Sequence, residues 1–79
     1  MKDRYLEGFV ELRVDVNDQQ FYRPIIEERH TKGCCQPTFE TFWRGDEYED
    51  ADEAYIALAA ECKRHQMVSD ERGEWSRPV

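Results

Sequence analysis

Apolar and polar side chains alternate along a stretch near the start of the chain. The even positions carry only Leu, Gly or Val, at Leu6, Gly8, Val10, Leu12, Val14 and Val16. The odd positions between Tyr5 and Asp15 carry charged or aromatic side chains. Successive side chains of a strand point to opposite faces, so this pattern predicts a long strand with one face on a core and the other in solvent.

Two more strands are expected after this one. Residues 17–20 predict a turn, because Asn and Asp tolerate left-handed backbone angles, and residues 21–29 predict the hairpin partner. Pro24 cannot donate a ladder hydrogen bond, so we expect that partner to be broken, bulged or at a sheet edge. Residues 31–37 predict a loop, and the β-branched and aromatic residues 38–44 predict a third strand. Its expected faces are Phe39, Thr41 and Trp43 on one side, and Thr38, Glu40, Phe42 and Arg44 on the other.

A single helix is predicted after the third strand. Asp50 is a suitable N-cap, and Glu53 completes a capping box three residues later. Cations are favoured in the last turn of a helix, which is where Lys63, Arg64 and His65 fall. The stripe expected to pack on the sheet consists of Ala51, Ala54, Tyr55, Leu58 and Cys62.

These elements predict one domain over residues 1–79, in which residues 69–79 form either a short strand or a docked tail. The expected fold class is α+β with two layers. A three- or four-stranded antiparallel sheet packs against one α-helix in the order β-β-β-α, with or without a C-terminal strand.

Length and charge exclude several classes of function. The chain has 79 residues, with 11 Lys and Arg against 18 Asp and Glu, so its net charge is −7. This charge argues against nucleic acid or an anionic membrane as a direct partner, because both are bound through Lys and Arg. No apolar run approaches the roughly 20 residues of a membrane span, and the start of the chain does not resemble a signal peptide. Ten aromatic residues argue against disorder. We expect a folded cytoplasmic protein.

Histidine and cysteine residues offer one candidate metal site. His30, Cys34, Cys62 and His65 are four ligands that tetrahedral zinc accepts. Their spacing lacks the paired ligands of known zinc motifs, and on the alternative interpretation Cys62 is a core residue and His65 a helix-end cation. We therefore expect neither a metal nor another cofactor.

Catalysis finds little support in the sequence. Cys34 or Cys35 beside His30 is a candidate nucleophile, but no third orienting group and no oxyanion hole is recognisable. Gly-rich phosphate loops and hydrolase or metalloprotease motifs do not occur. We expect a protein that is not an enzyme, with reduced thiols in the loop.

A run of acids gives the strongest functional hypothesis. Six carboxylates fall within eight positions, and the set expected to bind a partner is Asp46, Glu47, Tyr48, Glu49, Asp50 and Asp52. Helix capping explains Asp50 and its neighbours, but it does not require Asp46, Glu47 or Glu49. One interpretation is a solvated helix entrance. The other is a surface that imitates phosphates and occupies a basic groove of another protein, with Tyr48 as an aromatic anchor.

The polar face of the first strand is a second candidate surface. Glu7, Phe9 and Glu11 are expected there, with Phe42 and Glu40 of the third strand beside them. Aromatic side chains among charges on an open sheet suit a protein partner. A stacking platform for RNA has the same composition, but the net charge disfavours it. Ile56 and Ala60 lie opposite the helix stripe and indicate a further contact or a homodimer.

Two resemblances accompany these patterns. Residues 37–64 (PTFETFWRGDEYEDADEAYIALAAECKR) resemble the last strand and helix of small β-β-β-α modules such as HicB-type antitoxins. The small, acidic chain without catalytic motifs is similar in character to phage-borne inhibitors of the anti-CRISPR kind. The second resemblance implies an inhibitor that occupies the basic surface of a protein that binds nucleic acid. The first implies, as the alternative, a regulatory subunit that binds one partner through its open sheet face.

Overall fold

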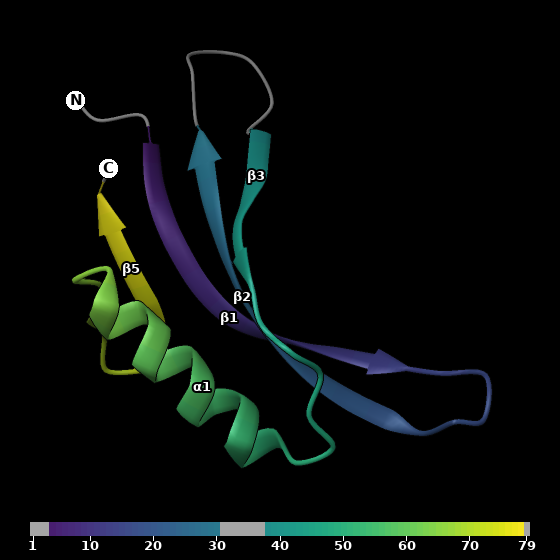
Figure 1. Cartoon of the computed structure of the whole chain (residues 1–79). Coiled ribbons are helices and arrows are strands. Elements are labelled where there is room, and N and C mark those ends of the chain that lie inside the picture. Colours follow the sequence, from purple (N-terminus) through teal and green to yellow (C-terminus); the bar gives the residue numbers. More distant parts are fainter. Residues whose placement is uncertain (1–3, 31–37, 79) are drawn as a thin grey trace.

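Two long strands form the centre of the structure. Strands β1 (Arg4–Val14) and β2 (Gln20–His30) pair antiparallel along their full length. Strand β3 (Thr38–Arg44) lies beside β2, while β5 (Trp75–Pro78) and β4 (Val68–Ser69) extend the sheet beyond β1, in the order β3-β2-β1-β5-β4 (Figure 1). Helix α1 (Ala51–Arg64) packs on one face. This computed structural model, which describes residues 4–30 and 38–78, confirms the α+β fold. The described residues form five strands, whereas three or four were predicted. The C-terminal part of the chain forms two short strands, β4 and β5, where at most one was expected.

The core lies between α1 and the two central strands. Its buried members are Leu6, Ile26, Leu58, Cys62 and Met67, with Val10, Trp43 and Trp75 packed around them. Leu6 and Ile26 belong to the face of the sheet that was predicted to be apolar, and Leu58 and Cys62 belong to the predicted helix stripe. Among the described residues, no helix has the length and apolar character that a membrane span requires.

Helix α1 has the N-cap that its sequence predicts, but not the predicted capping box, because within the described residues the Glu53 carboxylate accepts no hydrogen bond. The side chain of Asp50 accepts a hydrogen bond of 2.9 Å from the backbone N–H of Asp52, which confirms the N-cap. At the other end the backbone turns through Gln66, whose φ is 61°, and Arg77 of β5 donates a 3.0 Å bond to the carbonyl of His65. Tyr55 is 55% exposed, so its place on the buried stripe was predicted wrongly.

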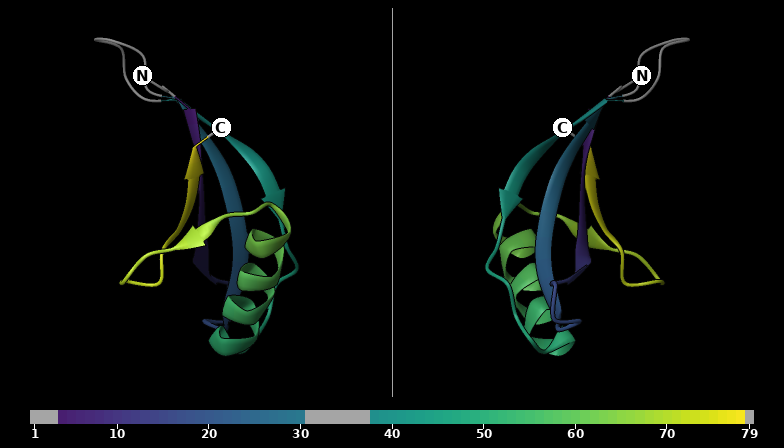
Figure 2. Two further views of the ribbon diagram at one scale, coloured as in Figure 1. Left: turned by 90° about the vertical axis from the view of Figure 1, so that its left-hand side faces the viewer. Right: turned by 90° about the vertical axis from the view of Figure 1, so that its right-hand side faces the viewer.

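The sheet is longer than the helix that covers it. Fourteen helical residues span about 21 Å, whereas eleven strand residues span about 36 Å. The two views in Figure 2 show α1 against part of one face of the curved sheet. Leu12 and Val14 are therefore more than half exposed although they continue the apolar alternation, and Val16 is 99% exposed beyond the end of β1. The prediction that the core face reaches Val16 is wrong.

Pro24 is buried in a central strand. Its strand is neither broken nor at a sheet edge as expected, because β2 pairs with β1 on one side and with β3 on the other. The third expectation, a bulge, is met only in the β2–β3 pairing, where the register shifts between Ile26 and Glu27. The N–H of Gly45 donates to the carbonyl of Pro24 at 2.9 Å. The N–H and C=O groups of one strand residue point toward the same neighbouring strand. Because the Pro24 carbonyl faces the β3 side, the N–H that proline lacks would also have pointed to that side. The ladder to β3 ends at this point.

A bulge changes the faces of β3. Trp43 is opposite Ile26 and Thr41 is opposite Glu27, so Phe42 is an extra residue on β3. The Phe42 ring meets the His65 ring edge to face, with centroids 5.0 Å apart, which places Phe42 on the helix side together with Trp43. The predicted division of β3 into two faces is therefore wrong for Trp43 and Arg44, whereas Phe42 shares the face of Glu40 as predicted.

Two tight turns of the chain share one geometry. The Asp15 carboxylate accepts hydrogen bonds from the N–H groups of residues 17 and 19, and the Asp70 carboxylate accepts them from those of residues 72 and 74. Each loop has a residue with positive φ at its fourth position, Asp18 in the first and Gly73 in the second. The predicted turn is thus confirmed, but it spans residues 15–19 rather than 17–20, because Gln20 already belongs to β2; β4 and β5 are connected in the same way.

Candidate functional site

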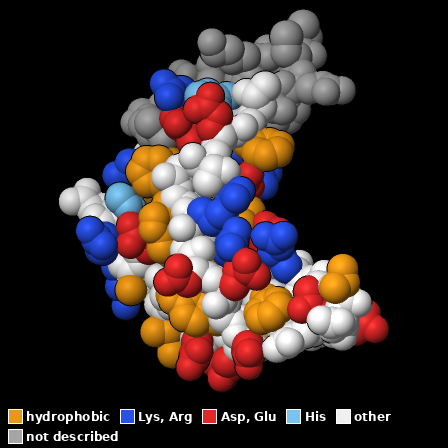
Figure 3. Space-filling view, turned by 45° about the vertical axis from the view of Figure 1, so that its right-hand side comes forward, with side chains coloured by type: hydrophobic (Ala, Val, Ile, Leu, Met, Phe, Trp, Pro, Cys, Tyr) orange, Lys and Arg blue, Asp and Glu red, His pale blue; other side chains and the backbone are white. Residues whose placement is uncertain are grey.

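The predicted acid run lies against the tip of the first hairpin. Tyr22 and Tyr48 exchange two backbone hydrogen bonds of 2.7 and 2.8 Å, and the Gln19 side chain donates to the Glu49 carboxylate at 3.2 Å. These contacts place the acids of the hairpin tip beside those of the run, and Figure 3 shows acidic side chains gathered along the lower part of this face. We call this surface the acidic end. Its members are Asp15, Asp18, Asp46, Glu47, Glu49, Asp50, Asp52 and Glu53.

Half of these carboxylates hold the local structure. Asp15 closes the hairpin turn and Asp50 caps α1. Glu47 forms an ion pair of 2.7 Å with Arg23, and Glu49 accepts from Gln19. Helix capping did not account for Glu47 or Glu49, and these contacts give each of them a role in holding the segment. The contacts arise between segments more than 20 residues apart, so no local pattern of the sequence announces them.

The other four carboxylates remain open to a partner. Asp18, Asp46, Asp52 and Glu53 are exposed, and within residues 4–30 and 38–78 their carboxylates have no hydrogen bond or ion pair. Asp52 and Glu53 lie in the first turn of α1, where the helix dipole favours negative charge. Tyr48, the predicted aromatic anchor, is half-buried and is held by its backbone.

The sheet face without a helix carries an ionic network. Arg29 lies 3.3 Å from the Glu7 carboxylate and 3.5 Å from that of Glu27, which is 8% exposed. Figure 3 shows this side of the molecule hollowed, with Lys and Arg side chains in the hollow. Phe9 is half-buried and Glu11 exposed on this face.

The third strand contributes other residues to this face than expected. Phe42 and Glu40 belong to the helix side, so their predicted place on the open face is wrong. Phe39 lies on the open face instead, opposite Arg29, and is 65% exposed. The cause is the bulge at Phe42, which no residue type in the segment signals.

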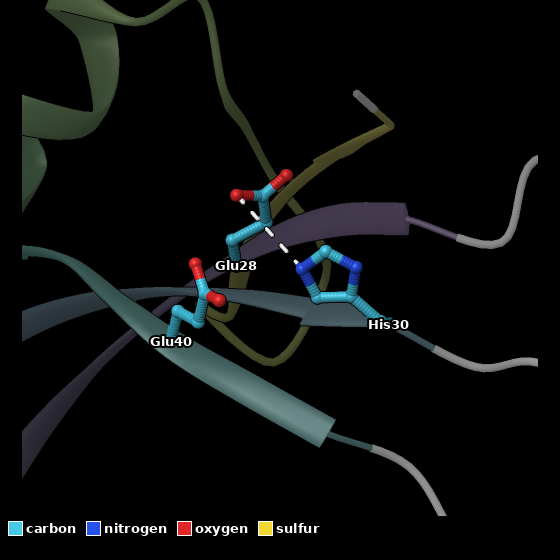
Figure 4. A group of neighbouring side chains, drawn as sticks. All are labelled: Glu28, His30 and Glu40. Atoms are coloured by element: carbon cyan, nitrogen blue, oxygen red, sulfur yellow. Dashed lines mark ion pairs between the residues drawn. The ribbon is translucent and has the colours of Figure 1, made fainter. Parts of the chain in front are cut away.

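A histidine and two glutamates meet at the far end of β2. One donor atom from each of Glu28, His30 and Glu40 lies within 4.8 Å of the others (Figure 4). Glu28 is directly opposite Glu40 in the β2–β3 pairing, and His30 Nε2 is 4.0 Å from a Glu28 oxygen. Of these residues the sequence singled out only His30 as a ligand. The available signal was the spacing Glu28-x-His30, which puts both side chains on one face of a strand.

The candidate zinc ligands His30, Cys62 and His65 form no common group of ligand atoms in the part of the chain that the structure describes. The Cys62 thiol is fully buried against the sheet, and burial, assisted by the negative charge of Glu61, raises its pKa to about 11. A metal binds the thiolate, so this shift disfavours Cys62 as a ligand. His65 Nε2 lies 2.9 Å from the Glu61 carboxylate. Cys34, and Cys35 beside it, lie outside the described residues.

The acidic end and the histidine cluster occupy opposite ends of β2, about 27 Å apart along the strand. They are separate candidate sites, one built from carboxylates alone and one from mixed oxygen and nitrogen donors. The chain matches no protein-family model, no curated protein and no solved structure.

Proposed function

We propose that this chain is a cytoplasmic, non-enzymatic binding module whose acidic end occupies a basic, nucleic-acid-handling site of a larger protein. The observation that carries the proposal is the backbone bridge between Tyr22 and Tyr48, which joins two acidic segments into one surface. Closely spaced carboxylates present a field like that of a phosphate strip, and Lys- and Arg-lined grooves attract such a field. The resemblance to small acidic inhibitors of the anti-CRISPR kind agrees with this mode of action.

The carboxylates that hold the local structure position the exposed carboxylates for binding. Glu47, Glu49 and Asp50 fix the segment that carries Asp46, Asp52 and Glu53. Ordering a charged segment before it binds lowers the entropy cost of association. The carboxylates that contact the partner are then Asp18, Asp46, Asp52 and Glu53, with the half-buried Tyr48 as the aromatic anchor.

A matched pair of charge reversals tests the proposal. Asp46→Lys with Asp52→Lys changes the acidic end, and Glu71→Lys with Glu74→Lys makes the same charge change on the exposed second turn. Each variant and the unchanged chain are immobilised and exposed to nuclease-treated host lysate at low and high salt. We expect a nucleic-acid-binding protein to be retained at low salt by the unchanged chain and the control, and to be lost from the Asp46/Asp52 variant.

The recovered protein then enters a competition assay. Increasing amounts of the unchanged chain should displace a labelled oligonucleotide from it, and the displacement should weaken steeply as salt rises. Equal retention by the Asp46/Asp52 variant, in a form with an unaltered circular dichroism spectrum, would refute the acidic end as the contact. Retention without displacement of the oligonucleotide would refute occupation of a nucleic-acid site.

The open sheet face supports a second candidate function, a regulatory subunit that binds one protein partner. The observation in its favour is Phe39, which is 65% exposed at the edge of the sheet face opposite α1. On this alternative, Phe39→Ala weakens binding more than the Asp46/Asp52 reversals do. The binding should then depend little on salt.

A further inference from the structure

We propose that Glu28, His30 and Glu40 form a binding site for a divalent transition-metal ion, with Zn²⁺ as its representative. The three side chains come from the neighbouring strands β2 and β3 and lie on one face of the sheet. Two carboxylate oxygens and one imidazole nitrogen form a donor set that Zn²⁺ and Mn²⁺ accept. Mg²⁺ and Ca²⁺ prefer oxygen donors alone, so the imidazole disfavours them.

Two features of the cluster call for a cation. Glu28 and Glu40 are directly opposite each other on adjacent strands, and like charges in this position destabilise a sheet. The Nε2 atom of His30 is closed to solvent, yet it has no hydrogen-bond partner within the described residues. Its 4.0 Å distance from Glu28 is too long for a hydrogen bond. Arg4 already pairs with one oxygen of Glu28, so an ion between the three side chains would chiefly neutralise Glu40, and it would satisfy the His30 nitrogen.

The geometry needs only side-chain adjustment to bind an ion. Bonds of about 2.0–2.2 Å place tetrahedral ligands about 3.4 Å apart, so donors that now lie within 4.8 Å of one another must approach by at most about 1.4 Å. Glu40 is exposed and free to rotate. Glu28 is oriented already, because one of its oxygens is held by Arg4 while the other faces His30 (Figure 4). Three protein ligands leave a fourth position for water or a partner's group.

Metal titration of the full chain tests this site. Metal-free protein is dialysed against Zn²⁺, and in parallel against Co²⁺, whose visible absorption reports the geometry and type of its ligands. We expect one ion per chain. Glu28→Gln and Glu40→Gln should each weaken binding at least about tenfold, and His30→Ala should do the same. Because Glu40 is exposed, we expect Glu40→Gln to fold normally. It therefore tests the site even if the Glu28 and His30 variants fail to fold.

Two control variants identify the ligands. His65→Ala removes the other histidine and should leave affinity unchanged, because that ring pairs with Glu61. Cys34→Ser with Cys35→Ser removes the two thiols that follow His30 in the sequence and should also leave affinity unchanged. Absence of a retained ion, full affinity in Glu40→Gln, or a thiolate-to-cobalt absorption band that disappears in the Cys34/Cys35 variant would overturn the proposal.

Discussion

Gly8 of β1 lies directly beneath Cys62 of α1, so closely that a β-carbon on Gly8 would be 2.8 Å from the Cys62 sulfur. The same β-carbon would be 3.2 Å from Leu58 Cδ1 and 3.3 Å from Trp75 Cβ. The helix thus approaches the sheet at the one position of the alternating pattern that has no side chain. This contact explains why glycine interrupts a row of Leu and Val on the core face of β1.

Gly8→Ala should therefore destabilise the protein. The added methyl group forces the helix or the Cys62 side chain to move, a cost of about 1–3 kcal/mol for overpacking in a core. Urea denaturation followed by circular dichroism measures the change. Combining Gly8→Ala with Cys62→Ala should recover part of the loss, because the closest contact is then removed. Equal stability of Gly8→Ala and the unchanged chain would contradict this packing.

The buried thiol should make stability depend on pH in the alkaline range. Burial, with a smaller contribution from the Glu61 charge, raises the pKa of Cys62 from its ordinary 9.0 to about 11 in the folded state. The unfolded chain loses this proton first as pH rises. The contribution of the neutral thiol is therefore complete below pH 9 and is lost as pH rises towards 11.

Variants without Cys34 and Cys35 isolate this effect. Two proteins without Cys34 and Cys35 are compared, one that retains Cys62 and one that carries Cys62→Ala. All their other titrating groups are the same. The urea midpoint should fall more between pH 9 and pH 11 in the protein that retains Cys62. Alkylation of Cys62 by iodoacetamide at pH 8 should be slow and should accelerate with unfolding. A fast reaction in the native state would show that the thiol is accessible.

Local features of this fold were predictable, and long-range ones were not. The alternation around Leu6 and the cap at Asp50 depend on neighbouring residues, so the sequence alone indicated a long strand and the start of a helix. The bulge at Phe42 depends on how β3 registers with β2 across a seven-residue connection, and no residue type marks it. That register also brings Glu40 opposite Glu28, which is why the histidine cluster was missed.

The sequence predicted where the acidic end lies, but not which of its carboxylates hold the structure and which are open to a partner. Six acids within eight positions are visible in the sequence, whereas the ion pair of Glu47 with Arg23 forms across 24 residues. The hairpin acids join this surface through the bridge between Tyr22 and Tyr48 and the hydrogen bond from Gln19 to Glu49. Charge density is thus readable from composition, but which charges are free depends on tertiary contacts.

Removing the Glu47 charge should destabilise the protein, whereas removing the Asp46 charge should not. Glu47→Gln breaks the 2.7 Å ion pair and leaves Arg23, a mostly buried side chain, without its partner. We expect a loss of about 0.5–1 kcal/mol, near the upper range for a partly exposed pair. Asp46→Asn, one residue away and without such a contact in the described residues, should change stability by less than about 0.5 kcal/mol. Thermal unfolding at low salt measures both.

The same two variants should also differ in the salt dependence of their stability and in their affinity for a partner. The stability difference between Glu47→Gln and the unchanged chain should shrink in high salt, because screening weakens a partly exposed ion pair. For partner binding the order should reverse, with Asp46→Asn losing more affinity than its stability change explains. Equal stability of the two variants at low salt would show that Glu47 is as free as Asp46.

The two related turns offer a last test, based on their residues of positive φ. Gly73 has φ of 81°, and a β-carbon added there would have no atom within 4 Å, so Gly73→Ala changes only the backbone preference. We expect it to cost about 1 kcal/mol, the penalty for a left-handed residue that has a side chain. At the equivalent position of the first turn, Asp18 has φ of 61° and already bears this strain.

Asp18→Gly should accordingly raise stability by a few tenths of a kcal/mol to about 1 kcal/mol, and Asp18→Asn should change it little, because Asn also tolerates this region. Urea denaturation of the three variants decides the matter. A destabilising Asp18→Gly would mean that the Asp18 carboxylate holds the turn, which would remove it from the acids available to a partner. A stabilising Asp18→Gly that also weakens partner binding would place the same carboxylate in the contact surface.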